Sequence, residues 1–158
     1  MTYGWAILIV IIVAAALYAL GVFNPATWTG SRATGFTNIG APAAGAWKLS
    51  ATAADTQFQL VLKNNLPSRV NVTAIAVKIG TTDCTNEAIG GVAIVAGPPA
   101  GVGAVEGIGT GFTVTANCGT QTAGSSYTSS VSLTYDNLDT GLTALSESGS
   151  LTGTVTAS

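Results

Sequence analysis

The first 23 residues form an almost uninterrupted apolar stretch. Sixteen consecutive nonpolar residues lie between Trp5 and Leu20, and one threonine and two glycines are the only interruptions of the wider segment Met1–Phe23. A helix of 23 residues would be about 35 Å long, which is enough to cross a bilayer core of about 30 Å. Because this helix would have no polar side, we expect it to be buried all round. The Asn24-Pro25 pair predicts its end, since the residue before a proline disfavours helical geometry.

Four explanations compete for this apolar segment. A cleaved signal peptide would need a basic start and a shorter apolar core, and a core helix of a soluble domain would be shorter and less uniformly apolar. Two explanations stay open: a transmembrane anchor, and a helix buried first in a membrane and later in an assembly. Arg32, the first charged residue, would place the following domain in the cytoplasm by the positive-inside rule. Because that domain has extracellular character, we expect a basic leader that preceded Met1 and was removed or left out.

From residue 35 onward, apolar and polar residues alternate with the period of two that is typical of β-strands. In Thr56–Lys63, for example, Phe58, Leu60 and Leu62 share one face. The apolar positions of Val70–Ile79 change face midway, which indicates a β-bulge or a strand buried on both sides. Strands are predicted at Ala46–Ala51, Thr56–Lys63, Val70–Ile79, Gly111–Cys118, Tyr127–Tyr135 and Leu151–Val155.

These patterns predict an α+β fold class, with a long N-terminal hydrophobic helix followed by an antiparallel, Ig-like β-sandwich. The expected domains are a polymerisation or transmembrane helix at 1–24, a linker at 25–34 and an extracellular β-sandwich at 35–158.

The composition removes several classes of function. Charged residues make up 8% of the chain, the formal net charge is −2, and there are five lysines and arginines. Five basic side chains are too few to neutralise the phosphates of a nucleic-acid backbone, and nucleic acid is therefore excluded as a partner. The chain has no histidine, the usual general base and a common metal ligand. We therefore expect no catalytic residue, no metal site and no cofactor, and an enzyme is the least supported class.

Two cysteines and one asparagine are the candidate sites of covalent chemistry. Cys84 and Cys118 are the only cysteines, and in an extracytoplasmic domain they favour a disulfide over two buried thiols. Asn71-Val72-Thr73 is the only N-x-[ST] sequence, which makes Asn71 a candidate glycosylation site without deciding whether it is occupied. The acidic residues near 83–87 and 136–139 could hold calcium, although turn chemistry is the simpler explanation.

The N-terminal residues carry a specific resemblance. Met1-Thr2-Tyr3-Gly4-Trp5-Ala6-Ile7-Leu8, followed by an Ile/Val stretch that ends at Asn24-Pro25, resembles the N-terminal segment of archaeal type IV pilins. The final residues, Ser148 to Val155, resemble the last strand of these pilins and of archaellins. These motifs cover about a fifth of the chain, whereas the likeness in architecture extends over all of it.

The resemblance implies a structural subunit of an extracellular pilus that polymerises into a helical homopolymer and serves adhesion. It also implies a class III signal peptide, cleavage by a prepilin peptidase, insertion in the cytoplasmic membrane before assembly, and dedicated assembly machinery. We expect the filament core to be formed by side chains of the apolar segment, namely Tyr3, Trp5, Ile7, Leu8, Ile11, Ile12 and Leu17.

Two other functions stay open at this point. A subunit of the archaellum filament would share the plan of an apolar helix and a β-domain, and would differ in serving rotation-driven motility. A monomeric, membrane-anchored binding module on the cell surface would keep its helix in lipid and would need no leader cleavage.

Overall fold

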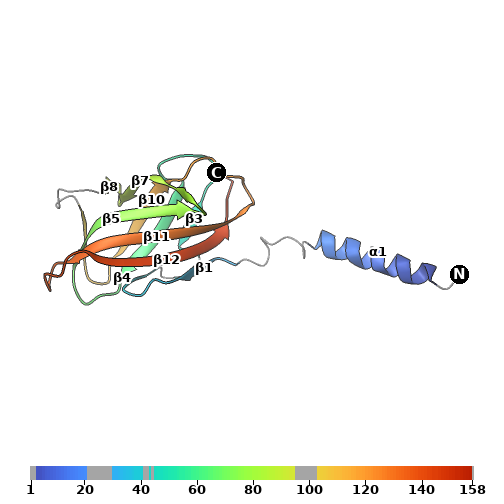
Figure 1. Ribbon diagram of the computed structural model, residues 1–158, viewed down its shortest axis with the longest axis horizontal. Helices are drawn as coiled ribbons and strands as arrows, with labels where there is room; N and C mark the ends of the chain where they lie inside the picture. Colours follow the sequence, from blue (N-terminus) through green and yellow to red (C-terminus); the bar gives the residue numbers. More distant parts are fainter. Residues whose placement is uncertain (1–2, 21–29, 41–42, 44, 95–102, 158) are drawn as a thin grey trace.

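The computed structural model describes residues 3–20, 30–40, 43, 45–94 and 103–157. One helix, α1, spans Gly4–Ala19 and precedes a β-domain that holds all the described strands (Figure 1). The strands are β1 (Arg32–Thr34), β2 (Ile39–Gly40), β3 (Trp47–Leu49), β4 (Phe58–Asn64), β5 (Val70–Ile79), β6 (Thr82–Asp83), β7 (Thr85–Ile89), β8 (Val92–Ala93), β9 (Ala104–Glu106), β10 (Gly111–Asn117), β11 (Ser126–Asn137) and β12 (Leu145–Thr154).

The strands form two antiparallel sheets. Sheet A has the order β1-β12-β11-β5-β6, with β9 also paired to β5, and sheet B has the order β2-β4-β10-β7-β8, with β3 also paired to β4. The longest ladder joins β11 to β12, from Ser126 opposite Thr154 to Tyr135 opposite Leu145. The two sheets lie face to face as the layers of a sandwich (Figure 1).

A single hydrophobic core fills the space between the sheets. Sheet A contributes residues such as Val72, Leu133 and Leu151, and sheet B contributes residues such as Phe58 and Leu60, all at most 1% exposed. The alternation is strict along β11, where every second side chain from Tyr127 to Asn137 is buried. Period-two burial therefore explains why these residues form strands with one face toward the core.

Several predicted strands agree with the structure to within a few residues, and the bulge in the fifth strand is confirmed. Along the ladder between β11 and β5, Thr134 is opposite Ala74 but Tyr135 is opposite Val72. Thr73 is thus the extra residue of a β-bulge, and it moves the buried positions from Val72 to Ile75. Strand β12 begins six residues earlier than predicted, at Leu145.

The predicted fold class, α+β with a long N-terminal helix, is wrong. Half of the described residues lie in strands, and the one helix that the structure describes has 16 residues. It ends at Ala19, with Leu20 as its C-cap, and a glycine, which disfavours helix continuation, follows in the sequence. The protein is therefore a β-rich chain with one short helix, and β1 already lies within the stretch predicted as the linker.

Candidate functional site

The surface of α1 is the most unusual feature of the described structure. Its sequence, GWAILIVIIVAAALYA, contains no charged residue, and none of its residues is buried. Eleven large hydrophobic side chains between Tyr3 and Leu20 are at least half exposed, against four in the rest of the described chain. The unburied apolar surface is thus concentrated on this helix, which lies apart from the sandwich in Figure 1.

The seven predicted filament-core residues all lie on or next to α1. Tyr3 is the N-cap residue and makes no side-chain capping hydrogen bond. Leu17 is partly buried, whereas the other six side chains are between 52% and 81% exposed. The seven positions are distributed around the whole helix, as expected for 100° of rotation per residue. Within one chain they do not converge on a common partner.

An apolar helix of 16 residues gains little stability alone in water, because most helical stability in proteins comes from packing of an apolar face. Burial of one large apolar side chain contributes roughly 1.5–3 kcal/mol, so the eleven exposed ones favour burial by tens of kcal/mol before ordering costs are counted. The helix also has no acidic residue in its first turn and no basic residue in its last. It therefore requires an apolar surrounding that its own sandwich does not supply.

Crossing a bilayer is a separate question from being buried. At 1.5 Å per residue, α1 would be about 24 Å long, against a hydrocarbon core of about 30 Å. Among the described residues, no helix is long and apolar enough to span a membrane.

The two cysteines form the disulfide that the sequence analysis favoured. Cys84 and Cys118 are bonded, with their Cα atoms 4.3 Å apart, and both are almost completely buried. Cys84 lies between β6 of sheet A and β7 of sheet B, and Cys118 follows β10 of sheet B. The disulfide thus fixes the point at which the chain crosses from one sheet to the other.

Asn71, the candidate glycosylation site, lies on β5 between two neighbouring strands. Its Cα partners are Asp136 of β11 and Val105 of β9. Its Oδ1 atom is buried without a hydrogen-bond partner, and a Cβ at Gly103 would overlap it. The Thr73 hydroxyl, the third member of the sequence motif, donates to the Thr134 carbonyl at 3.2 Å. Glycosylation of Asn71 stays a prediction.

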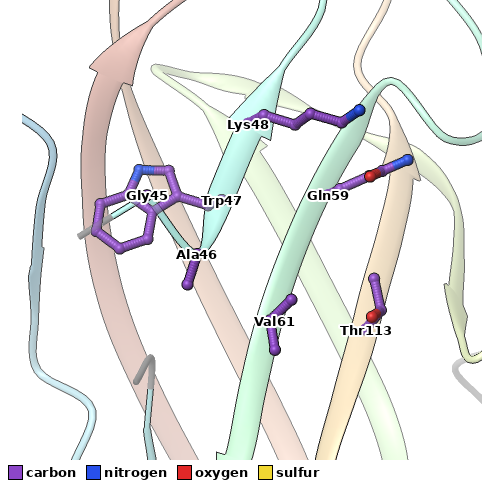
Figure 2. A pocket seen from close by; sticks show the side chains of 7 residues that line it. All are labelled: Gly45, Ala46, Trp47, Lys48, Gln59, Val61 and Thr113. Carbon is purple, nitrogen blue, oxygen red and sulfur yellow. The ribbon is translucent and has the colours of Figure 1, made fainter. Parts of the chain in front are cut away.

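A shallow hollow of 220 Å³ lies on the outer face of sheet B. The polar ends of Lys48 and Gln59 lie together at one end of it, and Val61 and Thr113 lie at the other (Figure 2). The indole of Trp47 points away from these four side chains (Figure 2) and donates to the Thr152 carbonyl at 3.0 Å. Its described lining residues include the Lys48 amine and the Thr113 hydroxyl, and no carboxylate or cysteine.

Two ion pairs and one partly buried carboxyl group account for part of the charge on the sandwich. Arg69 and Asp139 form an exposed ion pair at 2.8 Å, and the side-chain hydrogen bond from Arg69, together with its backbone N–H, lowers the pKa of Asp139. Burial raises the pKa of Glu106. Within the described ranges, no three acidic or cysteine side chains lie close enough together to hold a metal ion.

Glu147 is the residue whose role the sequence analysis missed. It is 8% exposed, and its carboxylate accepts hydrogen bonds from the backbone N–H groups of Thr37, Asn38 and Ile39. The signal was the inward phase of the last strand: counting back by two from Leu151 through Gly149 places Glu147 on the buried face.

No protein-family model, curated protein or solved structure matches this chain.

Proposed function

We propose that this chain is a structural subunit of an extracellular helical filament of the archaeal type IV pilin kind, and that copies join through α1. The observation that carries the proposal is the apolar surface of α1, which has no polar side and no buried residue. A second copy of the chain offers an equally apolar helix, so association of identical chains removes this surface from water on both partners.

The distribution of apolar side chains favours many neighbours over one. A two-helix coiled coil needs one narrow apolar stripe and leaves polar residues on the other sides. On α1, Trp5, Leu8 and Ile12 lie on one side, and Ile7 and Ile11 lie on another, with about 100° between successive residues. A helix of this kind is satisfied when other helices surround it, and repeated non-closing contacts between identical chains generate a filament.

Two properties of the sandwich support the proposal: a core that does not need α1, and an outer face of β11 that carries few charges. Its core is complete without α1, because no residue of the helix is buried. The outer positions of β11 carry hydroxyl side chains, including the exposed Ser126, Thr128, Ser130 and Ser132. Such an uncharged outer face lets neighbouring copies pack closely without the cost of burying like charges.

The biological context of the proposal comes from the resemblance to archaeal type IV pilins. It supplies cleavage by a prepilin peptidase, passage through the cytoplasmic membrane before assembly, and adhesion as the role of the filament at the cell surface. The sandwich would then be the part of the subunit that faces the surroundings.

The test places one charge in the middle of α1. Ile11→Asp is expected to abolish filaments, because a carboxylate buried without a partner among apolar helices is strongly unfavourable. Leu142→Asp, which replaces a 57% exposed apolar side chain between β11 and β12 with the same charge, is the matched control and should assemble normally. The measurement is electron microscopy of the material sheared from cells that produce each variant, with the amount of sheared chain determined by immunoblot.

Normal filaments from Ile11→Asp would refute assembly through α1. Equal loss of filaments in Leu142→Asp would also contradict the proposal, because the effect of the charge would then not be specific to α1.

A further inference from the structure

The first described residues after α1 are attached along the edge of sheet A. We call residues 30–39 the lead-in segment. Its strand β1 pairs antiparallel with β12, from Arg32 opposite Thr152 to Thr34 opposite Ser150. Before this strand, the Gly30 carbonyl accepts a hydrogen bond from the Thr152 hydroxyl at 3.3 Å. Contacts with β12 therefore begin at the first described residue of the segment.

The attachment continues beyond β1 through an aromatic ring. The Phe36 ring lies so close to Gly149 of β12 that a Cβ on this glycine would overlap it. Gly35 has a φ of +91°, and a side chain there would approach the Ser148 carbonyl to 2.9 Å. Two glycines thus let the lead-in segment lie directly against β12.

Glu147 provides the strongest attachment. Its Oε1 atom accepts hydrogen bonds from the Thr37 N–H, from the Thr37 hydroxyl at 2.9 Å and from the Asn38 N–H at 2.8 Å. Its Oε2 atom accepts from the Ile39 N–H at 3.0 Å. A carboxylate that is 8% exposed depends on such donors, and hydrogen bonds to a charged acceptor are about twice as strong as neutral ones.

The direction of the strands decides how these contacts respond to tension. Because β1 is antiparallel to β12, β1 begins beside the end of β12, and Glu147 lies near the beginning of β12. The connection between β11 and β12 lies at the opposite end of the sandwich from the start of β1 (Figure 1). A pull between these two ends acts along the strands, across hydrogen bonds that are perpendicular to them. All the contacts of the lead-in segment are then loaded at once.

We infer that the lead-in segment and β12 form a tension-bearing clamp, with Glu147 as its main attachment. The inference rests on the proposed function, in which α1 is held among neighbouring copies while the sandwich is pulled from outside the filament. The pulling force then enters the sandwich through the lead-in segment. Because of the clamp, the sandwich resists unfolding most strongly when the pull runs along β1 and β12.

The experiment is single-molecule stretching of the full chain, with detergent covering α1. One handle is attached at the N-terminus, and the second is attached either at Thr140, between β11 and β12, or at the C-terminus. The end of β12 lies beside the start of β1, so a pull from the N-terminus against the chain that follows β12 separates β1 from β12 one residue pair at a time. We expect the force of first unfolding to be about twofold higher with the Thr140 handle, because several hydrogen bonds must break together.

Glu147→Gln tests the attachment itself. With the Thr140 handle, the variant should unfold about tenfold faster at a given force, because the charged acceptor is lost. Asp83→Asn is the matched control, since it removes an exposed carboxylate on β6, at the other edge of sheet A, and it should unfold at the original rate. Thr37→Val, which removes one hydroxyl donor to Glu147, keeps the test possible if Glu147→Gln does not fold, and about threefold faster unfolding is expected.

Equal forces in the two pulling directions would overturn the clamp, and so would a Glu147→Gln chain that unfolds no faster than Asp83→Asn. These results are independent of assembly. A chain with the directional response that never forms filaments would contradict the proposed function and leave the clamp standing.

Discussion

At the scale of single residues, glycines decide where aromatic rings are buried. Gly153 of β12 is opposite Tyr127 of β11, and a Cβ on this glycine would lie 3.0 Å from the Tyr127 hydroxyl oxygen. The missing side chain leaves room for the tyrosine ring, which is 8% exposed. Burial raises the pKa of Tyr127 to about 12, because the phenolate would lose its hydration.

This pKa predicts an alkaline limit of stability. The ordinary tyrosine pKa is about 10, so below pH 10 Tyr127 is neutral in both the folded and the unfolded chain, and its contribution is complete. Between pH 10 and 12 the unfolded chain ionises first, so the free energy of unfolding should fall across this range. Urea denaturation at several pH values, in a detergent that covers α1, measures the fall. Tyr127→Phe should reduce it, and an identical fall in both chains would contradict the assignment.

At the scale of elements, the sequence predicts a strand well where its inward positions are apolar. Most inward positions of strands β4, β10 and β11 are apolar. In the first half of β12 the inward positions are Glu147 and Gly149. Neither is a large apolar residue, so this part of the sequence shows no alternation of apolar and polar residues. Strands of two or three residues, such as β2 and β6, are too short to show any period.

The helix and the candidate site show the same limit. Apolar composition predicts that α1 needs burial, but it does not determine where the backbone hydrogen bonds of the helix end. The helix predicted at 1–24 is therefore longer than the observed Gly4–Ala19. The candidate core residues of α1 were found because exposed apolar residues stand out in the sequence. The contacts of Glu147 with residues 37–39 join positions more than 100 residues apart, and only the folded chain brings them together.

Removing the disulfide should lower the free energy of unfolding by an amount that its loop length predicts. Cys84 and Cys118 are separated by 34 residues, and closing a loop of this length stabilises a fold by roughly 3–4 kcal/mol in the chain-entropy model. The Cys84→Ser, Cys118→Ser double variant should lose about this much free energy of unfolding in urea. Adding dithiothreitol should destabilise the original chain similarly and leave the double variant unchanged. Equal stability of the oxidised and reduced original chain would contradict a stabilising role.

At the scale of the whole molecule, two parts differ in what they need from their surroundings. The sandwich has its own core, a disulfide and few charges, whereas α1 has no buried residue. The proposed filament would satisfy both parts, because the helices would cover one another while the sandwiches face water. In that filament, the lead-in segment and Glu147 would connect the assembled helices to the outward-facing sandwich.

The most direct test of assembly through α1 is cryo-electron microscopy of filaments sheared from the cell surface without detergent. The proposal predicts a helical reconstruction whose central density fits the side chains of α1, such as Trp5 and Ile11, with the sandwiches outside. Recovery of the chain only as single copies in detergent-extracted membranes would contradict it, and so would a filament whose centre is formed by the sandwiches.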